Sequence, residues 1–195
     1  LSLFITLMAL STASSATHWV SPEGEATWQA SQSDSPLAGK AATSLAIANT
    51  NAKAGDTVYL RGGNYAGKTI QPSNSGTSED LRITFAKHAD EKVVFEESNG
   101  IRLLGKSYIS VSGMEFRQMH CFIRIGGGSY NIIAHCRFDG RSKDSREWVG
   151  AHIGAQGRNP STHNWIHHCE FYRFVYKDER PVSYTHLRAH ETFGY

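Results

Sequence analysis

Two segments of the chain repeat each other at a spacing of 22 residues. Residues 101–116 read IRLLGKSYISVSGMEF, and residues 123–138 read IRIGGGSYNIIAHCRF. The identical pairs are Ile101/Ile123, Arg102/Arg124, Gly105/Gly127, Ser107/Ser129, Tyr108/Tyr130 and Phe116/Phe138. A period of this length is typical of a solenoid, in which each coil buries its apolar side chains only against the next coil. A helix is excluded, because a 3.6-residue period is absent and one repeat contains three successive glycines.

A third, partial copy extends the pattern and predicts a parallel β-helix. Residues 164–171 (NWIHHCEF) overlay residues 131–138 (NIIAHCRF) at a spacing of 33 residues, so we expect an inserted loop, with residues 151–153 adding a strand to the same coil. Residues 81–85 and 92–95 are predicted strands of earlier coils. Three columns of side chains should then stack from coil to coil: Val111/Ile133/Ile166, Met114/Cys136/Cys169 and Phe116/Phe138/Phe171.

The two ends of the chain differ from the coils between them. Residues 1–16 join an apolar stretch to small residues, as in a partial signal peptide cleaved after Ala16; a buried element of the fold is the alternative. A short helix within residues 36–53 should cap the core. We interpret residues 177–195 as a tail derived from adapter sequence, with a real strand or linker as the alternative. Residues 17–176 are then the N-terminal coils of one β-helix domain.

Composition excludes two classes of partner. Charged residues make up 19% of the chain and its formal net charge is +2, without a basic run, which argues against nucleic acid. No segment after residue 16 is apolar enough to anchor the chain in a membrane.

An odd number of cysteines, three, argues against a disulfide framework. We expect Cys136 and Cys169 to be thiols that fill the core, with a disulfide as the alternative.

Three segments resemble the pectate-lyase-like superfamily of right-handed parallel β-helices. They are residues 18–24 (HWVSPEG), residues 54–65 (AGDTVYLRGGNY), and Ser75–Thr77 leading into residues 81–84 (LRIT). With the Cys-x-Phe coils at 136–138 and 169–171, the layout is most similar to the alginate lyase and chondroitinase B group. This resemblance implies catalytic Lys and Arg residues and acidic calcium ligands in later coils. We find no counterpart of those motifs here, and the chain is expected to stop before the solenoid is complete.

Polar residues near the edges of neighbouring coils are the candidates for chemistry. Elimination from a uronate needs a base, a cation that stabilises the developing charge, and a proton donor to the leaving oxygen. The weak catalytic candidates are Arg137, His152, His167, His168 and Glu170. Trp148, Arg137 and Asp139 are the weak candidates for substrate binding. A solvated face of satisfied turn residues is the bland alternative, and the one we favour.

Tryptophans and possible metal ligands are the remaining candidates. Trp28, Trp148 and Trp165 could be stacking platforms for sugars, and Trp148 is the best candidate because its loop is polar; core packing is the alternative for Trp165. His163, His167 and His168 have a spacing that converges on a helix but not on a loop and strand, so we predict no metal. Asp139, Asp144 and Glu147 lack a calcium-loop motif. No cofactor is evident, and calcium is expected only in later coils.

These observations lead to a functional expectation. We expect a secreted or periplasmic monomer that acts on an acidic, uronate-containing polysaccharide, as the non-catalytic front of a lyase that works by β-elimination. A carbohydrate-binding surface module and a glycoside hydrolase are the alternatives. Whether this chain is itself an enzyme stays open at this point, because a fold does not fix a chemistry.

Overall fold

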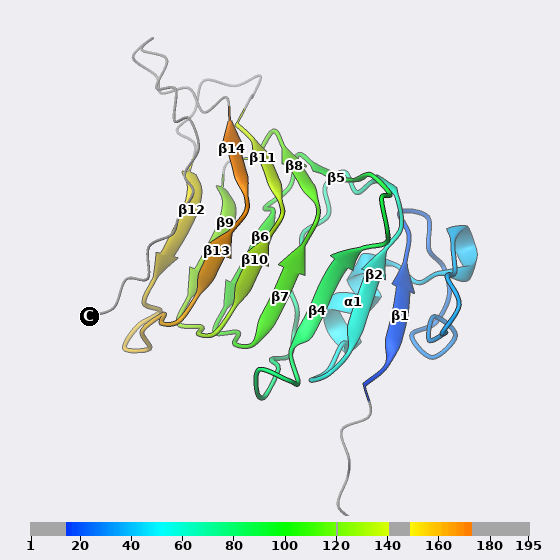
Figure 1. Ribbon diagram of the computed structural model, residues 1–195, viewed down its shortest axis with the longest axis horizontal. Helices are drawn as coiled ribbons and strands as arrows, with labels where there is room; N and C mark the ends of the chain where they lie inside the picture. The colour runs from blue at the N-terminus through cyan, green and yellow to red at the C-terminus, as the bar shows by residue number, and fades with distance from the viewer. Residues whose placement is uncertain (1–14, 120, 141–148, 173–195) are drawn as a thin grey trace, which may run out of the picture.

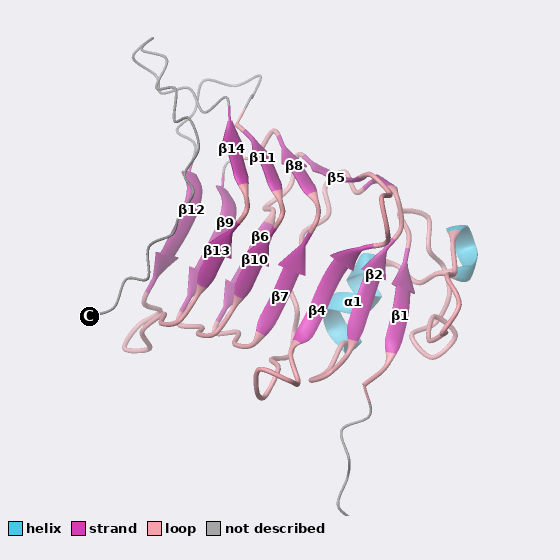
Figure 2. Ribbon diagram, in the orientation of Figure 1, coloured by secondary structure: helices cyan, strands magenta, loops and turns pink. Residues whose placement is uncertain are grey.

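The computed structural model describes residues 15–119, 121–140 and 149–172, and almost all of its regular structure is parallel β-strand (Figures 1 and 2). A six-stranded sheet has the order β1-β2-β4-β7-β10-β13, a five-stranded sheet β14-β11-β8-β5-β3, and a three-stranded sheet β12-β9-β6. The strands are β1 (Thr17–Val20), β2 (Thr57–Leu60), β3 (Gly63–Asn64), β4 (Ile83–Lys87), β5 (Val93–Glu96), β6 (Ile101–Leu104), β7 (Ile109–Ser112), β8 (Glu115–Arg117), β9 (Cys121–Gly126), β10 (Ile132–Ala134), β11 (Arg137–Asp139), β12 (Val149–Gly154), β13 (Trp165–His167) and β14 (Glu170–Tyr172).

The register of the strands confirms the predicted repeat. Ile101 pairs with Ile123 between β6 and β9, and Phe116 pairs with Phe138 between β8 and β11. The third copy also falls in register, because Phe171 of β14 pairs with Phe138. The predicted strand at 151–153 lies within β12, which pairs with β9. The three coils from β4 to β12 therefore each contribute one strand to each sheet in turn, which is the arrangement of a parallel β-helix.

Alternation along the strands sends one set of side chains into a single core. In β7, for example, Ile109 and Val111 are buried whereas the serines between and after them are partly exposed. Aromatic rings form a ladder through this core: Tyr65, Phe95, Phe116, Phe138 and Phe171 stack in sequence with centroids 4.7 to 5.2 Å apart. The ladder follows the hydrogen-bonding direction, in which neighbouring strands lie about 4.8 Å apart.

A buried asparagine column satisfies the backbone at one bend. Asn131 is fully buried, and its side chain accepts from Ile109 N (3.0 Å) and donates to Lys106 O (2.9 Å). Asn164, one coil later, accepts from both the backbone and the side-chain nitrogens of Asn131 and donates to Gly128 O. Buried polar backbone groups must be paired, so each asparagine links its own coil to the coil before it.

A second column, at the exposed side of the same bend, contains aromatic residues in the left-handed backbone region. Tyr108 (φ 56°), Tyr130 (φ 60°) and His163 (φ 54°) occupy equivalent positions in three coils. Their rings stack with centroids 4.9 and 4.6 Å apart, and Arg82 lies over the first ring. Left-handed φ values are costly for residues with a Cβ atom, so the stacked coils must hold these three residues in place.

The N-terminal end of the solenoid is covered. The helix α1 (Leu45–Asn51) begins at Ser44, whose side chain accepts from Ile47 N, and it buries Leu45 and Ala48 in the core. The Asn49 side chain donates to Thr69 O and accepts from Gln71 N, on either side of Ile70, which forms a parallel bridge with Ile101 of β6. Figure 1 shows α1 behind β2 and β4. The predicted capping helix is therefore present, although it is shorter than the window that predicted it.

The free edge of β1 is covered as well. Trp19 N donates to Ser31 O, and Thr43 N donates to Trp19 O. An unpaired strand edge is a template for aggregation, and segment 26–43 removes that hazard here.

Among the described residues, no helix has the length and apolarity needed to cross a membrane. The predicted signal peptide and tail lie almost entirely outside the described residues and stay predictions.

The ion pair of Arg61 and Glu91 links segment 26–43 to the bend between β4 and β5. Glu91 receives the guanidinium of Arg61 at 2.7 Å (Nη2) and 2.9 Å (Nε), together with Gly62 N and His88 Nδ1, while Arg61 also donates to Leu37 O. The Arg61 hydrogen bonds lower the pKa of Glu91 from 4.5 to about 2. The ionised form therefore stabilises the folded chain above pH 4.5, and this stabilisation is lost as the pH falls toward 2.

Replacing Glu91 by glutamine is expected to lower the free energy of unfolding by about 2 kcal/mol near neutral pH, because hydrogen bonds to a charged group are lost at a partly exposed site. Urea unfolding of both proteins, followed by circular dichroism, measures this difference. The difference should shrink below pH 4.5 and disappear as the pH approaches about 2, where the folded wild-type carboxylate is protonated too. A difference that is constant with pH would show that the charge of Glu91 does not stabilise the fold.

The cysteine column lies where the repeat predicted it. Met114 and Cys136 are buried, and Cys169 packs against the same core. All three cysteines are free thiols in the structure, as the sequence indicated. Burial raises the pKa of the Cys136 thiol, so this group is neutral and fills space in the core.

Candidate functional site

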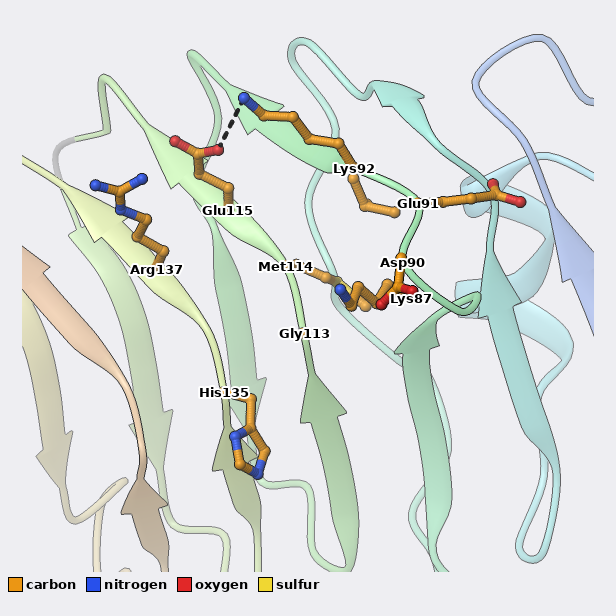
Figure 3. A pocket seen from close by; sticks show the side chains of 10 residues that line it. Lys87, Asp90, Glu91, Lys92, Gly113, Met114, Glu115, His135 and Arg137 are labelled. Carbon is orange, nitrogen blue, oxygen red and sulfur yellow. Dashed lines mark ion pairs between the residues drawn. The ribbon is translucent and has the colours of Figure 1, made fainter.

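A pocket of about 250 Å³ lies on the outside of the solenoid, where the chain bends from the six-stranded sheet to the five-stranded sheet (Figure 3). Three consecutive coils line it, through Lys87 and residues 90–93 at the bend from β4 to β5, residues 113–115 at the bend from β7 to β8, and His135 and Arg137 at the bend from β10 to β11. The pocket therefore depends on the coil register, because segments far apart in sequence meet at one bend. Its polar lining residues are Lys87, Asp90, Glu91, Lys92, Glu115, His135 and Arg137.

The carboxylates on two sides of this pocket are held by cations. Glu115 accepts from Arg117 at 2.7 Å and pairs with Lys92 at 3.5 Å, the contact drawn in Figure 3. Glu91 belongs to the Arg61 ion pair. Lys87, in contrast, has no ion-pair partner within the part of the chain that the structure describes, and its stem lies over Gly113, where a Cβ atom would be 2.7 Å from the lysine Cγ. Gly113 thus leaves room for the lysine side chain at the pocket.

Arg137 stands at the far side of the pocket on β11. Its Nε atom lies 3.2 Å from Glu170 Oε2 on the neighbouring strand β14, and its guanidinium lies 4.3 Å from the Tyr172 ring centroid. The Arg137 and Glu170 side chains are 53% and 70% exposed, so solvent screens their attraction. An anionic ligand could therefore compete with Glu170 for this guanidinium at small cost.

Three histidines converge next to the pocket. His135 follows β10, while His167 ends β13 and His168 follows it. Each contributes one ring nitrogen to a group whose atoms all lie within 4.8 Å of one another, and the Nδ1 atoms of His167 and His168 are 2.7 Å apart. Partial burial, followed by the proximity of His168 and His135, lowers the pKa of His167, which keeps this imidazole neutral at physiological pH.

Several sequence expectations about the site need correction. His152 lies on β12 in the three-stranded sheet, in register with Arg124, and not at the bend that carries Arg137, His167 and Glu170. Asp139 is only 5% exposed, so it is not a residue of an open binding face. For Trp165 the alternative of core packing is excluded: the side chain is 56% exposed, with its ring centroid 4.2 Å from that of His167, because alternation along β13 turns Ile166 toward the core.

The remaining candidates lie apart from the pocket, lie outside the described residues, or stay predictions. His163 stacks on Tyr130 at another bend, so it does not join His167 and His168; the histidine that lies beside these two is His135. Trp28 stacks on His18 with a centroid distance of 3.5 Å and packs against the core. Trp148, Asp144 and Glu147 lie outside the described residues. Catalytic roles for Arg137, His152, His167, His168 and Glu170 stay predictions.

Sequence reasoning missed Lys87, Lys92, Glu115 and His135. A signal for His135 was present, since the repeat aligns it with His168. Identical residues at equivalent positions of two coils predict neighbouring side chains on the surface as well as in the core. No comparable signal marked Lys87, because the loop between β4 and β5 differs in length from the later bends.

The strand order and register define a protein of the parallel β-helix class, with a polar pocket at one bend. Comparison with known families supports this class: the family model described as Chondroitinase B matches residues 40–180. The chain therefore belongs to the chondroitinase B family, a group of right-handed parallel β-helices in the pectate-lyase-like superfamily, as the resemblance implied. Comparisons with curated proteins and with solved structures gave no significant match.

Proposed function

We propose that this protein is exported as a monomer and acts on uronate-containing polysaccharides by β-elimination, with the pocket at the bend as part of its glycan-binding surface. The observation that carries the proposal is the placement of Lys87 and Arg137, two cations from different coils, around one open pocket in a member of the chondroitinase B family. Uronate carboxylates are the feature of such polymers that a cation recognises.

The spacing of the two cations suits a polymer. Lys87 ends β4 and Arg137 begins β11, so the two residues belong to coils that are separated by one intermediate coil. Adjacent strands are about 4.8 Å apart, which puts roughly 10 Å between these levels along the solenoid axis. A ligand that spans both levels is an oligosaccharide and not a single sugar. Trp165, exposed beside the histidines, offers a stacking platform at the next coil level.

The chemistry of elimination gives these cations a role. The base removes the proton next to the carboxylate, and the charge that develops on the carboxylate oxygens must be neutralised in the transition state. Arg137 can hold a carboxylate through two parallel hydrogen bonds, whereas Lys87 contributes a compact charge. Because their levels are roughly 10 Å apart, the two cations would hold the carboxylates of different sugars, and the cation at the reacting sugar would neutralise the developing charge.

Replacing Lys87 or Arg137 by alanine is expected to weaken the binding of a uronate oligosaccharide by about 3- to 10-fold, the scale of a partly exposed charge-assisted hydrogen bond. Isothermal titration calorimetry measures the affinity. The matched control is Arg124→Ala, which removes an exposed cation from the three-stranded sheet. Equal losses in all three variants would mean that the pocket is not the binding surface.

A non-catalytic glycan-binding β-helix is the second candidate, and one observation favours it. Glu115 and Glu91 are engaged by cations, so neither is a free acid or base in the pocket. An elimination assay separates the two candidates, because β-elimination creates an unsaturated uronate that absorbs ultraviolet light. Binding with increasing absorbance supports a lyase, and binding without any increase supports the binding module.

A further inference from the structure

We propose that His135, His167 and His168 form a binding site for a divalent transition metal of the zinc type. The site does not depend on the proposed glycan function. Its basis is the convergence of three imidazole nitrogens from two neighbouring coils within 4.8 Å of one another. Zn–N bonds are about 2.0–2.1 Å long, so ligands around one tetrahedral ion lie about 3.4 Å apart, which small side-chain rotations can reach from this arrangement.

The backbone explains why two consecutive histidines face the same side. Successive side chains of a strand point to opposite faces, so His167 and His168 would diverge if both were extended. His168 instead has a left-handed φ of 51°, which follows directly after β13. His135 has a φ of 53° at the equivalent position of the preceding coil, and its ring stacks on that of His168 with centroids 5.0 Å apart. The bend therefore brings both rings beside His167.

Ring stacking explains the positions of His135 and His168 but not the orientation of His167. His135 and His168 are stacked nearly parallel, whereas His167 meets them almost perpendicularly, at interplanar angles of 79° and 83°. This arrangement places the nitrogen atoms of His167 and His168 in contact, 2.7 Å apart between the two Nδ1 atoms. Two neutral imidazole nitrogens at that distance need a hydrogen between them, and a metal ion can take its place between the lone pairs.

The ligand type selects the class of ion. The donors of this group are imidazoles alone, which favour zinc, copper, nickel and cobalt over calcium and magnesium, whose ligands are oxygens. Three protein ligands leave at least one coordination position for water or for another ligand. His135 also lines the pocket at the bend, so an ion bound here would add positive charge at the edge of that pocket.

Titration of the whole chain with Zn²⁺ in the calorimeter, and with Co²⁺ followed by visible absorption, tests the proposal. Every protein carries alanine at His186 and His190, because this tail pair has the four-residue spacing of a helical metal site. The expected result is one ion per chain, with an affinity that falls at least about tenfold in His135→Asn and in His168→Asn. Loss of a group that only hydrogen-bonds to a metal ligand already lowers metal affinity about tenfold, and these variants lose a ligand itself. Calcium should not compete.

The matched control is His163→Asn. His163 has the same left-handed backbone and the same stacked environment, on Tyr130, but lies outside the cluster. Asparagine tolerates this backbone region, so all three variants should fold. His167→Gln removes the third ligand at a position on β13, where the left-handed backbone of the bend is not involved. An affinity in His135→Asn, His168→Asn and His167→Gln equal to that of His163→Asn, or no binding by the wild-type cluster, would overturn the site.

Discussion

Replacing Phe116 by alanine should lower the free energy of unfolding by about 4 kcal/mol, within the range of Phe→Ala changes in packed cores. Phe116 is fully buried, and its ring lies between Phe95 and Phe138 with centroids 5.0 and 5.2 Å away. The substitution removes apolar contact on both sides and leaves a cavity in the middle of the ladder, where rigid neighbouring coils cannot collapse into it. Chemical denaturation followed by circular dichroism measures the loss.

Phe116→Leu is the matched control for that experiment. It keeps most of the side-chain volume and removes the ring stacking, so we expect a loss of about 1–2 kcal/mol. The two variants together separate cavity formation from ring stacking. If Phe116→Ala lost less than about 1 kcal/mol, the ring would not be at the centre of a packed core, and the assignment of the coils would be wrong.

The second large effect concerns the asparagine column. Replacing Asn131 by alanine leaves the buried Ile109 N–H and the Lys106 carbonyl without their partners, and it removes the amide that Asn164 accepts from. Each buried group left unpaired costs about 1–3 kcal/mol, so the total should be roughly 4 kcal/mol. The change in volume is small, and the loss therefore reports hydrogen bonding more than packing.

Hydrogen exchange identifies the cause of that loss. The amide of Ile109 should exchange faster in Asn131→Ala by more than the change in global stability explains, because its acceptor has gone. Asn164→Ala, one coil later and half-buried, is the comparison and should lose roughly half as much free energy. An equal loss in both variants, without local exchange at Ile109, would contradict the proposed function of the column.

The fold could be predicted from the sequence because the repeat is present in side-chain identity. Phe116, Phe138 and Phe171 stack as aligned, and so do Val111, Ile133 and Ile166. An inserted loop did not hide the third copy, since a coil can lengthen at one bend without changing the strands that stack. The helical cap was also predictable, because the alanine-rich segment precedes a glycine turn.

The candidate site was much less predictable, for a physical reason. The side chains that meet at the bend between the two larger sheets depend on backbone angles, and the left-handed φ values at His135 and His168 reverse the direction that strand alternation would give. His152 was misplaced because the strand at 151–153 belongs to another sheet of its coil. For Trp165 the residue type left a stacking platform and core packing both open, and alternation with Ile166 decides for the exposed position.

The function is therefore best tested through the chemical feature that the pocket should recognise. The most direct measurement compares the affinity of this chain for a uronate oligosaccharide with its affinity for the same oligosaccharide after reduction of the carboxylates to alcohols. We predict binding of the acidic form that weakens as salt is added, and at least about tenfold weaker binding of the neutral form. Equal affinity for the two forms, or binding of neither, would contradict the account.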